Sequence, residues 1–232
     1  MLYILSVGGS IIVPEGEVDV SFLKSFKKMI VREIGRGNRF VVVTGGGGTS
    51  RRYQAAARKV TKLDPEDIDW LGIHATRLNG HLMRTILRDE AHPIMYKNPM
   101  SVPKTWEESV LIVAGWKPGW STDYIAVRMA KRLGASMVFN LSNIEYVYDA
   151  DPRKNSEAKP MKEMNWKQFR ALVGDTWDPG MNVPFDPIAA RLAHESGLTV
   201  TILNGRNIPN IIRAMEGKSF KGTVVGKGKE GE

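Results

Sequence analysis

Apolar and polar residues follow two different rhythms along this chain, and the rhythms predict strands and helices in turn. Short runs rich in β-branched residues, at residues 41–43 and 110–113, are typical of buried strands. Longer segments, at residues 21–34 and 68–87, carry apolar residues three or four positions apart, which predicts helices with one apolar face. Because strands alternate with helices, we expect an α/β fold with a mostly parallel sheet covered on both faces.

The same patterns place the other elements. Further strands are expected at residues 2–7, 40–44, 94–96, 137–140, 198–203 and 223–225, and further helices at 49–60, 124–133, 165–173, 188–196 and 208–215. Residues 11–13 are expected to continue extended from the first strand. Residues 100–108 are expected to form a short helix or a lid, residues 174–185 an irregular loop, and residues 226–232 a frayed tail.

The stretch at residues 41–53 carries the strongest chemical signal. A buried-type strand stops at four glycines, residues 45–48, and a helix is expected to follow at once. Glycines let a backbone approach a ligand closely, and a helix N-terminus offers free N–H groups and partial positive charge, which together suit a phosphate. Arg51 and Arg52 are expected in the first helical turn, where a bound anion would explain two cations. The alternative is a surface turn with two solvated arginines.

Similar turns follow other strands. Gly8, Gly9 and Ser10 end the first strand, and Ser121 or Thr122 can cap the helix expected at residues 124–133. Asp186 is expected to cap the helix that follows Pro187. In parallel sheets ligands bind beyond the carboxyl ends of the strands, so these turns are expected to meet at one edge.

Composition narrows the possible chemistry. The 232 residues contain no cysteine, which excludes disulfides and zinc-thiolate sites and fits a reducing cytoplasm. The net charge of +8 is spread along the chain, so a nucleic-acid partner rests on charge alone and is not expected, and no run reaches the ~18 apolar residues that span a membrane. The four histidines lack zinc spacing. Trp116 and Trp120 could pack on a base or sugar or belong to the core.

Six motifs come in the order seen in archaeal-type uridylate kinases, of the amino-acid kinase superfamily, and the chain resembles that family over nearly its whole length. The motifs lie at residues 5–10, 43–47, 69–79, 118–123, 148–152 and 186–190. The resemblance implies a three-layer α/β/α sandwich with an open, mainly parallel sheet. It also implies one domain, residues 1–232, whose N-terminal part mainly binds the acceptor and whose C-terminal part mainly binds ATP.

The resemblance further implies Mg²⁺-dependent transfer of the ATP γ-phosphate to UMP in pyrimidine biosynthesis, and a homo-oligomer, often a hexamer. By matching motif, the ATP-binding residues would be Gly8, Gly9, Ser10, Gly47, Arg51, Ser142, Tyr148 and Asp151. The UMP-binding residues would be Gly46, Asp69, Trp116, Lys117, Pro118, Gly119, Trp120, Ser121 and Thr122. Asp186, Arg51 and Ser10 would be catalytic, and the nucleotide phosphates would hold Mg²⁺.

The chain departs from the family pattern at three places. Ser6 stands where superfamily members often carry lysine, Glu145-Tyr146 replaces an Asp-Gly pair, and the acceptor loop contains Trp116, Lys117 and Trp120. Two alternatives therefore stay open. One is a related phosphotransferase that acts on a small carboxylate or carbamate, and the other is a nucleotide- or oxyanion-binding protein without activity.

Overall fold

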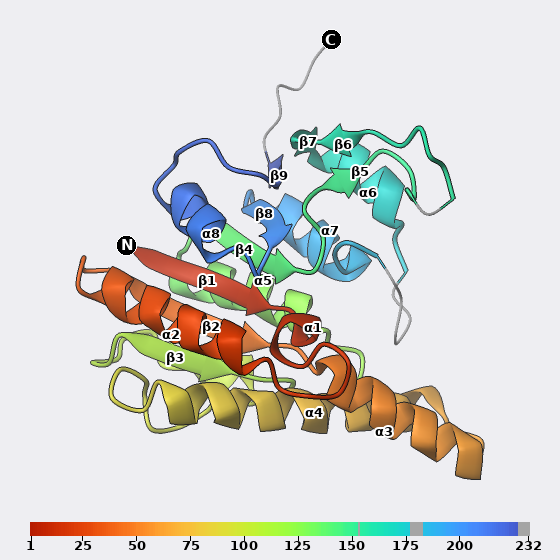
Figure 1. The fold of residues 1–232 in the computed structure, drawn as a ribbon, viewed down its shortest axis with the longest axis horizontal. Helices are drawn as coiled ribbons and strands as arrows, with labels where there is room; N and C mark the ends of the chain where they lie inside the picture. The colour runs from red at the N-terminus through yellow and green to blue at the C-terminus, as the bar shows by residue number, and fades with distance from the viewer. Residues whose placement is uncertain (153, 177–182, 227–232) are drawn as a thin grey trace.

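A seven-stranded sheet runs through the centre of the computed structural model, which describes residues 1–152, 154–176 and 183–226 (Figure 1). In spatial order its strands are β3 (Val110–Val113), β2 (Arg39–Thr44), β1 (Leu2–Val7), β4 (Met137–Ser142), β8 (Thr199–Asn204), β9 (Thr223–Gly226) and β7 (Glu163–Asn165). All neighbouring pairs are parallel except β8 and β9. A separate hairpin joins β5 (Val147–Tyr148) and β6 (Pro160–Met161).

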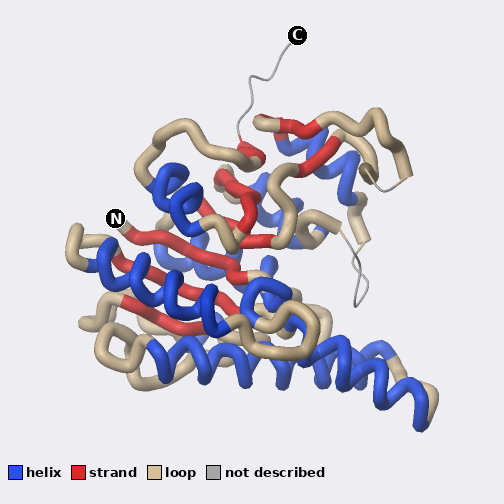
Figure 2. The backbone as a smooth tube through the Cα atoms, in the orientation of Figure 1, coloured by secondary structure: helices blue, strands red, loops and turns tan. Residues whose placement is uncertain are grey.

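Helices cover both faces of this sheet, which Figure 2 shows in one view. They are α1 (Gly9–Ile12), α2 (Val20–Ile34), α3 (Gly47–Val60), α4 (Pro65–Ile86), α5 (Thr122–Leu133), α6 (Trp166–Val173), α7 (Pro187–Glu195) and α8 (Ile208–Met215), with a 3-10 turn η1 (Pro99–Ser101). Successive residues of a strand point to opposite faces, so Ile4 packs in the core under α5, α6 and α7, and Leu5 in the core under α1, α2 and α8. The predicted three-layer α/β/α fold is confirmed.

Two local predictions are wrong. Residues 11–13 do not continue extended, because Gly9–Ile12 form the helical turn α1, in which Ile11 and Ile12 are fully buried in the core. The strand expected at residues 94–96 is absent from the described structure, where Tyr96 makes only an isolated bridge to Val113. Burial of the two isoleucines favours the helical turn over the extended run that β-branched residues indicate.

Several element boundaries also differ from the prediction. Helix α3 begins at Gly47, two residues earlier than expected, so Arg51 and Arg52 lie in its second turn rather than its first. The element expected at residues 100–108 is limited to η1, and β5, β6 and β7 were not predicted because two or three residues carry no periodicity. Residues 177–182 of the expected loop and 227–232 of the expected tail lie outside the described residues.

Side-chain caps fix the helix starts that matter for the site. Ser121 Oγ accepts a hydrogen bond from Tyr124 N at 3.0 Å and begins α5. Asp186 Oδ1 accepts one from Ala189 N at 2.8 Å and begins α7, with Pro187 in the first turn as predicted. Across the described ranges, none of the helices has the length and apolar character needed to cross a bilayer.

Candidate functional site

Two glycine turns lie back to back at the carboxyl ends of the neighbouring strands β1 and β2. A Cβ atom on Gly9 would collide with the backbone of Gly45, Gly46 and Gly47, and Gly47 itself has φ +62°. Only glycine permits such close backbone contact together with a positive φ. The contact brings residues from two predicted phosphate turns to one place on the sheet edge.

Arg51 turns back from α3 towards the first glycine turn. Its Nη1 donates to Ser10 Oγ at 3.1 Å and its Nη2 donates to the Pro14 carbonyl oxygen at 2.7 Å. Among the described residues, no carboxylate lies within 4 Å of the Arg51 guanidinium. The structure thus joins Ser10 and Arg51, as the sequence predicted, and leaves the guanidinium charge available to an anion.

A group of polar side chains lies under these turns and contains a residue that the prediction did not single out, Asp123. Its Oδ1 accepts hydrogen bonds from Ser6 Oγ at 3.0 Å and Asn140 Nδ2 at 2.9 Å, and its Oδ2 accepts from the backbone N of Asp186 at 3.3 Å. Elements β1, β4, α5 and α7 therefore meet at one carboxylate. The sequence signal that could have identified Asp123 is its position, because it lies in the first turn of the helix that follows a strand and a turn.

The two acidic residues are held in an environment that favours their protonated forms. Removal from water and the nearby Asp186 carboxylate raise the pKa of Asp123 to about 7, against the opposing hydrogen bonds from Ser6 and from the Asp186 backbone. Burial also raises the pKa of Asp186, which is 4% exposed, against hydrogen bonds from Ser121 and from the backbone at Ala189 and Ile188. Strongly shifted carboxyls that are grouped at a sheet edge are typical of functional sites.

The predicted acceptor loop, residues 116–122, is attached to helix α4 at two points. Asp69 Oδ2 accepts a hydrogen bond from Gly119 N at 2.8 Å, and Arg77 Nη2 donates to the Trp116 carbonyl oxygen at 2.8 Å. Arg77 was not among the predicted site residues, although it lies two turns beyond Asp69 on α4. The loop is therefore held in place before any ligand binds.

The aromatic side chains of this loop pack on one another. The rings of Trp116 and Trp120 meet edge to face with centroids 4.7 Å apart, and the Lys117 ammonium lies 4.6 Å from the Trp116 ring centroid. Both tryptophans are partly buried and contact the core under α5, α6 and α7. The structure thus supports the interpretation that these rings belong to the core, and packing on a base or sugar stays a prediction.

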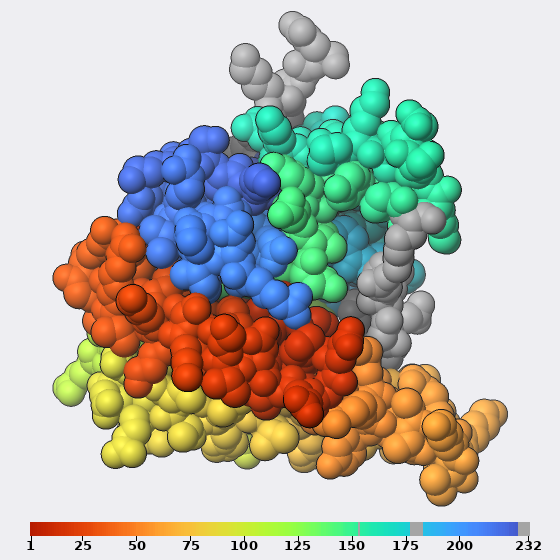
Figure 3. All heavy atoms as spheres, viewed as in Figure 1, coloured from red at the N-terminus to blue at the C-terminus, as the bar shows by residue number. Residues whose placement is uncertain are grey.

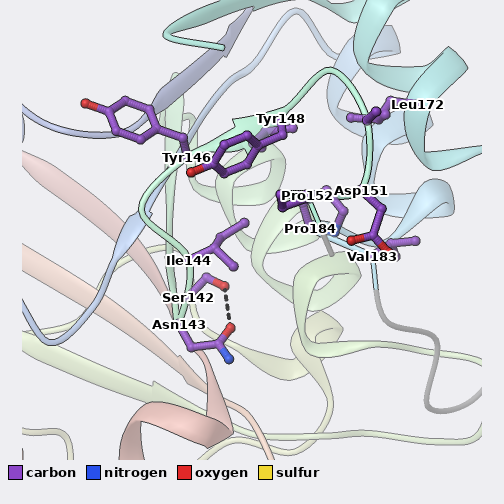
Figure 4. Close-up of a pocket in the computed structure, with 12 residues that line it drawn as sticks. Ser142, Asn143, Ile144, Tyr146, Tyr148, Asp151, Pro152, Leu172, Val183 and Pro184 are labelled. Carbon is purple, nitrogen blue, oxygen red and sulfur yellow. Dashed lines mark hydrogen bonds between the residues drawn. The ribbon is translucent and has the colours of Figure 1, made fainter. Parts of the chain in front are cut away.

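A separate cavity of about 550 Å³ follows the end of β4 (Figure 4). Ser142, Tyr148 and Asp151 line it together, as expected of the predicted ATP residues, and so does Tyr146. Gly8 N donates to the Leu141 carbonyl oxygen at 2.8 Å, so the cavity begins beside the first glycine turn. Its volume is in the range of small-molecule sites.

The acidic side chains of the site bear on whether the protein itself could hold a metal ion. In the described part of the chain, no three His, Cys, Asp or Glu side chains are grouped closely enough to hold a metal ion. The carboxyl groups of Asp123 and Asp186 lie together at this edge of the sheet and on their own supply two side chains to a divalent ion. Binding of Mg²⁺ mainly through nucleotide phosphates stays a prediction.

Comparison with known proteins gives consistent matches. The model of the amino acid kinase family matches residues 1–204. The uridylate kinase of Methanocorpusculum labreanum is 32% identical over 226 residues, covering 96% of this chain and 94% of that protein, and that of Methanospirillum hungatei is 32% identical over 224 residues, covering 96% and 93%. The crystal structure of uridylate kinase from Archaeoglobus fulgidus matches with a TM-score of 0.82 and 28% identity, covering 97% of this chain and all of that one.

The raised pKa of Asp123 predicts a specific pH dependence of stability. Between pH 4 and 7 the folded protein keeps a proton that the unfolded chain loses, so the free energy of unfolding should fall as pH rises through this window. Asp123→Asn removes this titrating carboxyl group. The free energy of unfolding of the variant, relative to that of the wild type, should therefore rise by about 2–4 kcal/mol between pH 4 and pH 7. Urea unfolding at each pH measures the difference.

The exposed Asp89 offers a matched control, because Asp89→Asn also replaces one carboxylate by an amide. Parallel stability profiles for the wild type and Asp123→Asn across this window would contradict the prediction.

Proposed function

The chain belongs to the amino acid kinase family, and from this premise we propose that it transfers the γ-phosphoryl group of ATP to UMP, giving UDP for pyrimidine nucleotide synthesis. The observation that carries the proposal is the pair of glycine turns packed back to back, with Arg51 directed at Ser10, at the edge where the sheet of an α/β protein binds ligands. The relatives named uridylate kinase align with this chain over nearly its full length.

Phosphoryl transfer needs positioned groups and positive charge more than a covalent nucleophile. The donor nucleoside is assigned to the cavity with Ser142, Tyr148 and Asp151, next to the turn that begins at Gly8. Its phosphates then reach the N–H groups of Gly9, Ser10 and Gly47, and the Arg51 guanidinium. Preorganised donors of this kind stabilise the charge that develops on the transferred group. Mg²⁺ bound to the phosphates would supply further neutralising charge.

The acceptor is assigned to the other side of the turns, against Gly46 and the loop at residues 116–122. The carboxylate of Asp69 holds this loop with one oxygen, and its second oxygen can accept a hydrogen bond from a ribose hydroxyl. Trp116, Lys117, Trp120 and Thr122 offer aromatic faces, a cation and a hydroxyl to the nucleotide. Pro118 and Gly119 shape the turn. The Ser121 side chain hydrogen-bonds to the carboxyl group of Asp186, the proposed catalytic residue.

The residues under the turns align these two halves. Asp186 is proposed to organise the transfer centre from the N-terminus of α7, and Asp123 is proposed to position it by connecting Ser6, Asn140 and the Asp186 backbone. One domain thus contains an acceptor side built mainly from its N-terminal part and a donor side built mainly from its C-terminal part.

Acceptor choice is the direct test of this function. We expect UMP to stimulate ADP release from ATP well above CMP, AMP, acetylglutamate or carbamate, because Asp69 and the aromatic loop suit a nucleotide. A coupled ADP-release assay with this panel measures it. Turnover with a carboxylate or carbamate but not UMP would instead support a related phosphotransferase, and nucleotide binding without turnover would support a binding protein.

Three substitutions test the proposed centre. Arg51→Ala should lower kcat by about 10²–10³, because it removes a charged donor, and Ser6→Ala should lower it by at most about tenfold, because it removes one neutral hydrogen bond. Asp186→Asn keeps the helix cap and should leave the melting temperature near that of the wild type while lowering kcat at least 100-fold. Steady-state kinetics and thermal melts decide. Full activity of Asp186→Asn, or equal effects at Ser6 and Arg51, would refute the assignment.

The homo-oligomer, hexameric by resemblance, stays a prediction, as does a cytoplasmic location. Support comes from helices α3 and α4, which leave Tyr53, Val60 and Leu78 63%, 87% and 62% exposed, and the end of α3 projects from the body in Figure 3. Exposed apolar side chains on surface helices are typical of a subunit interface. Light scattering at micromolar concentration should give a multiple of the 25.9 kDa chain mass, and a monomer would contradict the prediction.

A further inference from the structure

Arg206 lies directly beyond strand β8, at the same edge of the sheet as the glycine turns. Gly205 N donates to the Ser142 carbonyl oxygen at 2.8 Å, and a Cβ atom on Gly205 would lie 2.9 Å from Leu141 Cβ. This contact presses the chain at residue 205 against the end of β4, where the donor cavity begins. The backbone N of Arg206 in turn donates to Asn204 Oδ1 at 3.0 Å. The base of the side chain is therefore fixed.

The Arg206 side chain reaches across to the first glycine turn. Its Nη2 donates to the Ser10 carbonyl oxygen at 3.0 Å, while Arg51 Nη1 donates to Ser10 Oγ at 3.1 Å. Two guanidinium groups from opposite ends of the chain thus converge on one residue of the predicted phosphate turn. Like charges that converge on one residue repel each other, and an anion bound between or beside them offsets this repulsion.

Asp19 offsets part of this charge. Its Oδ2 forms an ion pair with Arg206 Nε at 3.8 Å without a hydrogen bond, while its Oδ1 accepts a hydrogen bond from Phe22 N at 2.9 Å and caps α2. The Arg206 side chain is 43% exposed, so a ligand can reach it. A guanidinium has five N–H donors, and the bond to Ser10 uses one of them.

We propose that Arg206 binds the triphosphate of the phosphoryl donor, beside the turn at Gly8–Ser10 and opposite Arg51. This inference rests on the proposed function and adds a residue to it. Ser6, at the end of β1, carries no charge, and Arg206 supplies a cation from another element of the same sheet edge. Arginine suits this task because its planar fork can bind two phosphate oxygens at once.

Direct titration of ATP and of adenosine into the full-length protein tests the assignment. Arg206→Gln should weaken ATP binding by about 10- to 100-fold, the effect of losing a charged hydrogen-bond partner, and should leave adenosine binding and the KM for UMP within threefold. Arg206→Lys, which keeps the charge without the fork, should weaken ATP binding by an intermediate factor. All variants should melt within a few degrees of the wild type.

Arg213→Gln is the matched control. Arg213 lies on α8, and its Nε donates to the Ser219 carbonyl oxygen at 2.7 Å, so it has the same kind of backbone contact away from the glycine turns. ATP affinity equal in Arg206→Gln and Arg213→Gln would overturn the inference. So would a parallel loss of adenosine affinity, which would mean that Arg206 only braces the cavity.

The binding readout separates this inference from the function on which it rests. If ATP binding depends on Arg206 but no acceptor is phosphorylated, the triphosphate assignment stands and the kinase function fails. If UMP is phosphorylated normally and Arg206→Gln binds ATP like the wild type, the function stands and this inference fails. Should Arg206→Gln not fold, Arg206→Lys alone decides, since unchanged ATP affinity in that variant would refute a bidentate phosphate contact.

Discussion

The contact between two glycine turns is the constraint on which the rest of the structure depends. Strands β1 and β2 are parallel neighbours, and the chain leaves both at the same edge of the sheet. The two turns that follow these strands must therefore pack against each other. A side chain on Gly9 would have no room there, because the backbone of residues 45–47 occupies it. The contact directs α1 and α3 away from the edge, and it brings the donor groups of Ser10 and Arg51 together. The proposed phosphate site and the packing contact of the two turns are thus the same feature.

Beneath the turns, the structure keeps two carboxylates close together at an energetic cost. Burial disfavours the charged form of each, and at Asp123 repulsion from the Asp186 carboxylate adds to this effect. Hydrogen bonds from Ser6 and Asn140 offset part of the cost at Asp123. A lysine at residue 6 would place a positive charge beside the pair, whereas Ser6 offers only a neutral hydrogen bond. Among the described residues, Arg51 and Arg206 bring positive charge to the turn above the pair, where both donate hydrogen bonds to Ser10.

The sequence predicted those features that depend on local pattern. The β-branched run at residues 41–43 indicated a central strand, and Asp186 followed by Pro187 indicated the start of α7, which the structure confirms. It predicted that the glycine turns meet at one edge, but not the side-chain contacts that connect other distant segments. Ser6 and Asp123 are 117 residues apart, and Ser10 and Arg206 are 196 apart, so only the strand order β1-β4-β8 brings these pairs together. The helical turn α1 was missed for a related reason, because burial in a tertiary core decided against the extended preference of its isoleucines.

The two proposed substrate sides are held by different contacts. The cavity assigned to the donor begins where β4 and β8 end, and backbone hydrogen bonds at Gly8 and Gly205 hold it to the sheet. The loop assigned to the acceptor is held by side chains of α4, through Asp69 and Arg77. The same helix also reaches the second glycine turn, because Asn79 Nδ2 donates to the Gly45 carbonyl oxygen at 2.7 Å. Helix α4 therefore connects the loop to the glycine turns, so substitutions at Asp69 or Arg77 would act on the loop and one at Asn79 would act on the turn.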